Sequence, residues 1–181
     1  MNTLNNMFTI TMPAKMYIAG KDIIVTDPCY FLGRKIWDLL MDEWFHGNEE
    51  TETSEKGVIE FNNGAKVLYS STAHGDGSYP VFVDKSSGKS VHANETGVDA
   101  GLIAVVTIED LRKIEKDYDM KDKKPFDVDN KWFPRINDFN GEVEADDKGN
   151  FIGDLEVNTQ GEIESEEYIP GEDIDDEEEP F

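Results

Sequence analysis

Residues 101–106 read Gly-Leu-Ile-Ala-Val-Val, and this run decides the expected fold. Five consecutive apolar side chains follow the glycine, so a strand formed here has two apolar faces. Such a strand is buried on both sides and is typical of the interior of a sheet. We therefore predict a central strand over residues 98–106, with the other elements arranged around it.

Turn signals before this run predict antiparallel hairpins. Residues 58–61 and 66–71 flank an Asn-Gly dipeptide, which is a strong hairpin signal. A second pair of β-prone segments, residues 78–84 and 89–92, flanks a Lys-Ser-Ser-Gly turn. Mostly antiparallel pairing follows from these short connections.

Two segments have the periodicity of helices. The first is predicted over residues 34–45, where large apolar side chains recur at i, i+3, i+4 and i+7: Trp37, Leu40, Met41 and Trp44. The second is predicted over residues 107–118, with Thr107 as its N-cap and Asp110 at the reciprocal position of the cap. The expected fold class is α+β: a mostly antiparallel β-sheet with two helices, followed by an acidic, partly disordered C-terminal tail.

The length of 181 residues predicts one domain and a tail. We expect a compact β-rich α+β domain over residues 1–135 and an acidic hairpin-like extension or linker over 136–165. Residues 166–181 are expected to be a disordered acidic tail. The segment 141–165 contains weak strand patterns but few apolar side chains to fix them.

The net charge of −23 is distributed unevenly along the chain. Residues 1–135 hold 16 Lys and Arg against 22 Asp and Glu, a net of −6. Residues 136–181 hold one Lys against 18 Asp and Glu, a net of −17. A negative field of this size repels nucleic acid and anionic membranes and attracts basic protein surfaces. Direct binding of nucleic acid or membrane is therefore not expected.

A single cysteine, Cys29, excludes a disulfide within the chain and favours a reducing compartment. The N-terminal residues have no basic stretch followed by a continuous apolar stretch, and no long apolar segment follows. We therefore expect neither a signal peptide nor a transmembrane span, and we expect the protein to be cytoplasmic.

The C-terminus is the candidate partner-binding segment. It is an acidic run closed by one aromatic side chain and a carboxylate, and its candidate contact residues are Asp173, Asp175, Asp176, Glu177, Glu178, Glu179, Pro180 and Phe181. This tip resembles the acidic, Phe-terminated tail of single-stranded DNA-binding proteins. The resemblance implies that the terminal Phe enters an apolar pocket on a repair or replication protein while basic residues hold its carboxylate. Glu179 stands where that family usually has Ile, which removes one apolar contact.

Three short stretches, each with an acid beside turn-forming residues, are a second candidate site. Their possible pocket residues are Asp27, Cys29, Tyr30, His74, Asp76, Tyr79 and Asp99. Asp, Cys and His side chains are suited to acid–base or metal chemistry. However, Asp-Pro and Asp-Gly are common turn sequences, and the chain has no HExxH, Walker A, GxSxG or GxGxxG pattern. The structural role is the favoured interpretation, and no catalytic residue and no cofactor is assigned.

The same stretches carry a family resemblance. Asp-Pro-Cys-Tyr at 27–30, His-Gly-Asp-Gly-Ser-Tyr-Pro at 74–80 and Val-Asp-Ala-Gly at 98–101 resemble a loosely defined family of small bacteriophage and bacterial proteins. The family's function is uncharacterised, and the similarity spans roughly residues 16–106. The resemblance implies a shared β-rich fold and a phage origin.

Three functions are compatible with these patterns. The first is a phage-encoded acidic interaction protein that recruits or blocks a basic DNA-handling or defence protein, as a DNA mimic or inhibitor would. The second is a single-stranded DNA-binding protein whose acidic tail regulates a basic, aromatic groove; its candidate residues are Lys121, Lys123, Lys124, Phe126, Lys131, Trp132, Phe133 and Arg135. The third is a small-ligand-binding protein or a metal-dependent hydrolase that uses the three acid-bearing stretches.

Overall fold

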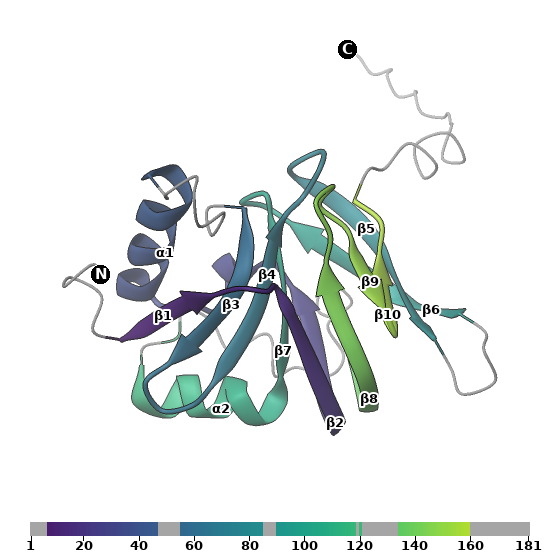
Figure 1. The fold of residues 1–181 in the computed structure, drawn as a ribbon, viewed down its shortest axis with the longest axis horizontal. Helices are drawn as coiled ribbons and strands as arrows, with labels where there is room; N and C mark the ends of the chain where they lie inside the picture. The colour runs from purple at the N-terminus through teal and green to yellow at the C-terminus, as the bar shows by residue number, and fades with distance from the viewer. Residues whose placement is uncertain (1–6, 47–54, 85–89, 119, 121–133, 160–181) are drawn as a thin grey trace, which may run out of the picture.

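One antiparallel sheet of ten strands organises the computed structural model (Figure 1). The structure describes residues 7–46, 55–84, 90–118, 120 and 134–159. In the sheet the strands follow the order β1-β3-β4-β7-β2-β8-β9-β10-β5-β6. Their bounds are β1 (Phe8–Thr11), β2 (Lys15–Thr26), β3 (Lys56–Phe61), β4 (Lys66–Ser71), β5 (Gly77–Asp84), β6 (Ser90–Val98), β7 (Leu102–Thr107), β8 (Arg135–Ala145), β9 (Phe151–Gly153) and β10 (Leu155–Val157).

The two α-helices are α1 (Arg34–His46) and α2 (Ile108–Asp117), and a 3-10 turn, η1 (Pro28–Tyr30), precedes α1. The expected fold class of a mostly antiparallel sheet with two helices is confirmed for the described residues. None of these described helices is long and apolar enough to cross a membrane.

Strand β7 lies inside the sheet, between β4 and β2, and all six of its residues are buried. Val105 stands opposite Leu68 on one neighbour and Val25 on the other. The prediction of a buried interior strand is therefore confirmed. Its N-terminal limit differs, because Val98 ends β6 and the chain bends over residues 99–101. Gly101 in this bend adopts a φ of 80°, a conformation that glycine tolerates best.

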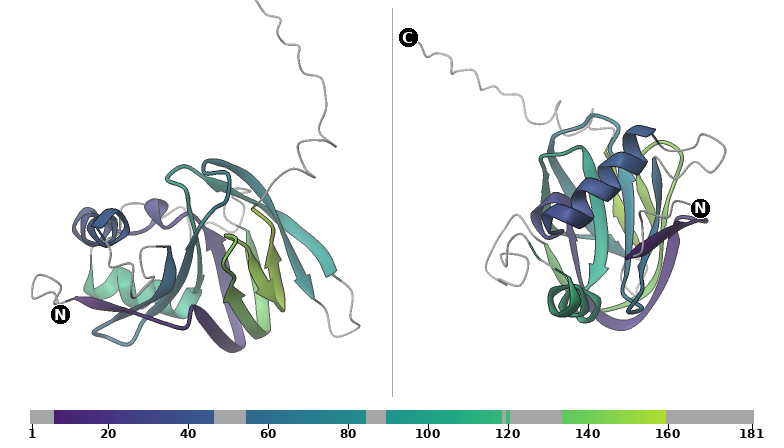
Figure 2. Two further views of the ribbon diagram at one scale, coloured as in Figure 1. Left: turned by 45° about the horizontal axis from the view of Figure 1, so that its top comes forward. Right: turned by 90° about the vertical axis from the view of Figure 1, so that its left-hand side faces the viewer.

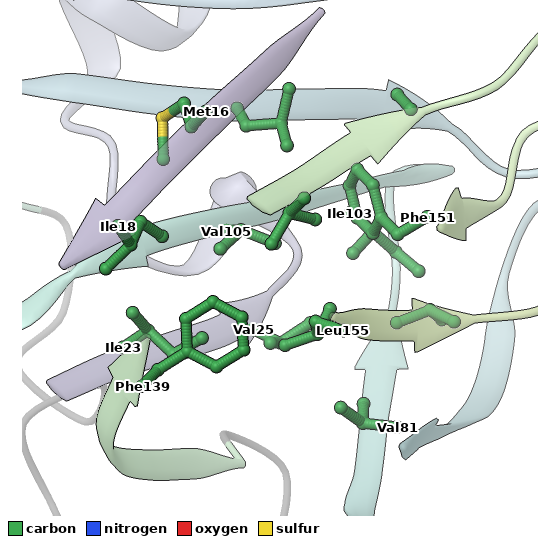
Figure 3. Packing of buried hydrophobic residues seen from close by; sticks show 14 of the residues in the cluster. Met16, Ile18, Ile23, Val25, Val81, Ile103, Val105, Phe139, Phe151 and Leu155 are labelled. Atoms are coloured by element: carbon green, nitrogen blue, oxygen red, sulfur yellow. The ribbon is translucent and has the colours of Figure 1, made fainter. Parts of the chain in front are cut away.

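The sheet curls so that one of its faces is buried against itself. Alternate residues of β2, β7 and β8 meet those of β9, β10 and β5 in an inner core (Figure 3), which contains Met16, Ile18, Val25, Val105, Phe139, Phe151, Leu155 and Val81. Because successive side chains of a strand point to opposite faces, this core fixes which residues point outward along each strand.

The outer face carries a second core, and the helices cover it. Side chains of β1, β3, β4, β7 and the C-terminal half of β2 pack there against α1 and α2. Figures 1 and 2 show both helices beside these strands, at the end of the molecule away from β5 and β6. Leu40 of α1 and Leu111 and Ile114 of α2 are inaccessible to solvent.

The N-terminus of α2 is capped as predicted, with one difference. The Asp110 N–H donates to the Thr107 hydroxyl at 2.9 Å, which satisfies one of the helix's unpaired donors. The carboxylate of Asp110, however, accepts from the backbone N–H of Lys66 at 3.2 Å. Asp110 thereby joins α2 to β4. Its carboxylate makes this tertiary contact where a capping box would have it accept from the backbone N–H of the N-cap residue.

Residues 135–157 lie within the sheet, whereas the sequence suggested an appended hairpin or a linker after residue 135. Strand β8 pairs with β2 along most of its length, and β10 pairs with β5. The few apolar side chains of this segment suffice because nearly all of them point into the inner core, as Val143, Phe151, Leu155 and Val157 do. Residues 160–181 lie outside the described part of the chain.

The position of β10 in the core predicts the cost of truncating it. Leu155→Ala removes a side chain with no solvent exposure, so we expect the free energy of unfolding to fall by about 2–5 kcal/mol. Chemical denaturation followed by circular dichroism measures this change. Glu156→Ala, at the exposed neighbouring position, is the control and should stay within about 0.5 kcal/mol of the wild type. Equal, small effects of both substitutions would show that the segment is peripheral.

Candidate functional site

The carboxylate of Asp27 is the centre of the candidate pocket, and it is buried with no solvent exposure. Asp27 follows β2 and caps η1, where its Oδ1 accepts from the Cys29 N–H at 2.8 Å. Its Oδ2 accepts from the N–H groups of Asp99 at 2.9 Å and Ala100 at 2.7 Å. One side chain thus ties the loop after β2 to the loop before β7.

The local sequence explains this geometry. Pro28 restricts Asp27 to an extended backbone, and the observed φ of −64° and ψ of 128° place its side chain over the first N–H groups of η1. Pro28 itself occupies the first turn, where a missing N–H costs nothing. The Asp-Pro dipeptide therefore positions the carboxylate, and the turn ending at Gly101 brings two further donors to it.

Burial has the largest influence on the pKa of Asp27. Burial raises the pKa of Asp27, and hydrogen bonds from Cys29, Ala100 and Asp99 oppose part of that rise by stabilising the carboxylate. The Tyr30 hydroxyl is bonded to the Asp99 carboxylate. Burial, followed by this bond, raises the pKa of Tyr30. The tyrosine therefore stays protonated and donates to Asp99.

The second stretch joins this group through the backbone. His74 and Asp76 are exposed, whereas Tyr79 is buried and donates its hydroxyl proton to the Gly75 carbonyl at 2.8 Å. Thr72 links this loop to the third stretch: its N–H donates to the Gly101 carbonyl at 2.9 Å, and its hydroxyl donates to Gly75 at 2.7 Å. Thr72 was missed by the sequence reasoning, because a lone threonine beside a strand gives no signal.

The structure thus unites Asp27, Cys29, Tyr30 and Asp99, but it leaves His74 and Asp76 on the surface. Three cavities of about 500, 650 and 520 Å³ are formed by described residues, and none of these three is lined by Asp27, His74, Asp76 or Asp99. Cys29 lines the third, together with Trp37 of α1. Among the residues that the structure describes, no group of three or more His, Cys, Asp or Glu is placed to hold a metal ion.

This arrangement suits a structural role, in which Asp27 holds the two loops together, better than acid–base chemistry. A buried carboxylate that accepts three N–H bonds has its oxygens committed to the backbone, and a catalytic carboxylate needs an oxygen within reach of the reacting proton. A ligand pocket at these loops stays a prediction.

The other two candidate sites fall mostly outside the described residues. The tail residues from Asp173 to Phe181 do so entirely, as do the lysines and aromatic residues between 121 and 133. Arg135 is described, and its guanidinium pairs with Asp22 at 3.1 Å. The Asp138 N–H, together with Arg135, holds the pKa of Asp22 below its usual range. Arg135 is therefore engaged in the β2–β8 connection.

Comparisons with known proteins give no family assignment. No protein-family model matches the chain, and searches of curated proteins and of solved structures find no significant similarity.

The three hydrogen bonds accepted by Asp27 predict that a small substitution there lowers the stability of the fold strongly. Asp27→Asn preserves the shape of the side chain but turns an amide donor toward a backbone donor, so we expect the free energy of unfolding to fall by about 2–4 kcal/mol. Urea denaturation at neutral pH measures this. Asp76→Asn, on an exposed loop position, should change it by less than about 0.5 kcal/mol. Unchanged stability of Asp27→Asn would contradict the structural role and would favour the acid–base role considered for this stretch.

Proposed function

We propose that this chain is a phage-encoded acidic interaction protein that acts in the host cytoplasm. It binds a basic protein, one that handles DNA or defends the host, through its acidic surface and its Phe-terminated tail. The observation that carries the proposal is the charge distribution: 18 acids and one lysine lie within residues 136–181. Charge of one sign concentrated in one quarter of a chain is a feature of partner recognition rather than of folding.

The folded part of that quarter supports the proposal. Residues 136–159 contain seven acids and one lysine. The strands β8 and β10 direct their apolar residues inward, and Glu142 and Glu156 are exposed on the other side. The acids therefore face a partner while the same strands remain anchored in the core.

The tail supplies a contact of a different kind. Phe181 supplies an aromatic ring, and the acids before it supply carboxylates, so one short segment offers both apolar burial and charge-assisted hydrogen bonds. A pocket with an apolar floor and basic walls on the partner satisfies both groups. Surface ion pairs contribute little each and are screened by salt, so the affinity is modest and depends on ionic strength.

Removing the tail tests this function. Deletion of residues 172–181 should abolish capture of the basic partner from bacterial lysate at low salt, with the captured protein identified by mass spectrometry. Phe181→Ala keeps every side-chain charge and separates the aromatic contact from bulk acidity; we expect it to weaken binding of the purified partner about tenfold.

Other outcomes of this test favour other functions. Capture that is indifferent to the deletion would contradict the proposal. Tighter binding of single-stranded DNA after the deletion, measured by fluorescence anisotropy, would favour a DNA-binding protein whose tail competes for its groove. A ligand-binding or hydrolytic activity unaffected by the deletion would favour the loop cluster.

A further inference from the structure

Half of the outer face of the sheet is left without a helix among the described elements. The helices cover the outer sides of β1, β3, β4, β7 and the C-terminal half of β2. The strands β8, β9, β10 and β5, with the N-terminal half of β2, direct their other face into the inner core. Figure 1 shows β5, β9 and β10 at the end of the molecule away from α1 and α2, with β8 and β2 between them and the helices.

Two large apolar side chains are exposed on this uncovered half. Tyr17 on β2 retains 68% of its accessible surface, and Ile152 on β9 retains 41%. Met12 is the only other exposed large hydrophobic side chain among the described residues. Tyr17 and Ile152 lie on the two strands that flank β8, and exposed apolar surface bordered by polar residues is a feature of interaction sites.

Acidic and apolar side chains alternate across these strands. Tyr17 stands opposite Glu142, and Glu144 stands opposite Ile152. Glu156 on β10 stands opposite the half-buried Phe82 on β5. Residues opposite each other have Cβ atoms about 5 Å apart, so each of these carboxylates borders an apolar group. We define the outer acidic face as Lys15, Tyr17, Phe82, Glu142, Glu144, Ile152 and Glu156.

The outer acidic face carries an excess of negative charge. It holds three glutamates and one lysine, and that lysine, Lys15, pairs with Glu142 at 3.7 Å. Glu142 and Glu144 are two residues apart on one strand, which separates them by about 7 Å. A partner with cationic groups at comparable spacing complements the face, whereas nucleic acid and a negatively charged protein are repelled.

We propose that the outer acidic face is the docking surface for an arginine-rich surface of the partner protein. This inference rests on the proposed function and names the folded part of the contact. The guanidinium group fits the alternation because it forms paired hydrogen bonds with carboxylates and stacks on aromatic rings. Its aliphatic stem covers neighbouring apolar groups. Lysine matches the charge but not the stacking.

The position of the acid-rich C-terminal sequence strengthens this assignment. That sequence continues directly from Thr159, two residues after β10 ends, and β10 carries Glu156 of the outer acidic face. A partner held at the face therefore experiences the tail at high effective concentration. Two weak, salt-sensitive contacts joined in this way give a tighter complex than either contact alone.

Site-resolved NMR on the full chain tests the face separately from the tail. The probe is nona-arginine, with nona-lysine as the control of equal charge. We expect amide signals of Tyr17, Ile152 and Glu156 to shift on titration. The dissociation constant obtained from them should rise about tenfold in the variant Glu142→Gln/Glu144→Gln/Glu156→Gln.

A matched variant controls for net charge. Asp38→Asn/Glu55→Gln/Asp76→Asn removes three exposed acids from elsewhere on the described surface and should change that dissociation constant less than about twofold. Tyr17→Leu should abolish the preference for arginine over lysine, because it removes the ring but keeps an apolar side chain.

Three outcomes would overturn the inference. Shifts confined to residues 160–181, or equal weakening by the two triple variants, would show that the face is not a specific surface. Shifts of the same amides on raising the protein concentration without peptide would assign the face to a second copy of the chain. A tail deletion that leaves partner capture unchanged would defeat the proposed function and leave these results as they stand, so the two failures are distinguishable.

Discussion

The curled sheet buries one face against itself, and this burial determines which side of each strand points into the inner core. Strand β2 is central to it: Met16, Ile18 and Val25 enter the inner core, while Ile24 enters the core beneath the helices. A slip of one residue would exchange the two faces of a strand, so its register is strongly fixed. The outward positions are consequently fixed as well, and acids can occupy them without disturbing the core.

Local signals allowed much of the fold to be predicted from the sequence. The interior strand, the Asn-Gly hairpin, both helices and the Thr107 cap are confirmed because each depends on neighbours in the chain. The incorporation of β8, β9 and β10 was not predicted, because it depends on pairing with strands distant in sequence. Strands β9 and β10 have only two large apolar residues each, so they look weak alone and become stable only when they pair with the rest of the sheet.

The same limit applies to the candidate sites: the sequence indicates individual residues, but not their contacts with residues far away in the chain. Asp27 was one of several acids that the sequence marked as candidates, and its hydrogen bonds depend on N–H groups 72 and 73 positions away. The outer acidic face had no signal in the sequence, since Tyr17, Glu142 and Ile152 come from three separate strands. What the sequence did indicate was the excess of acid after residue 135, and the topology then assigned some of these acids to one face.

If the outer acidic face is the docking surface, a cationic partner binds the folded body as well as the tail. Carbodiimide labelling of exposed carboxylates, read by mass spectrometry with and without the purified partner, tests it most directly. We expect Glu142, Glu144 and Glu156 to lose reactivity in the complex while Asp38 and Glu55 retain it. Protection limited to acids beyond Thr159, with the three glutamates as reactive as in the isolated chain, would contradict it.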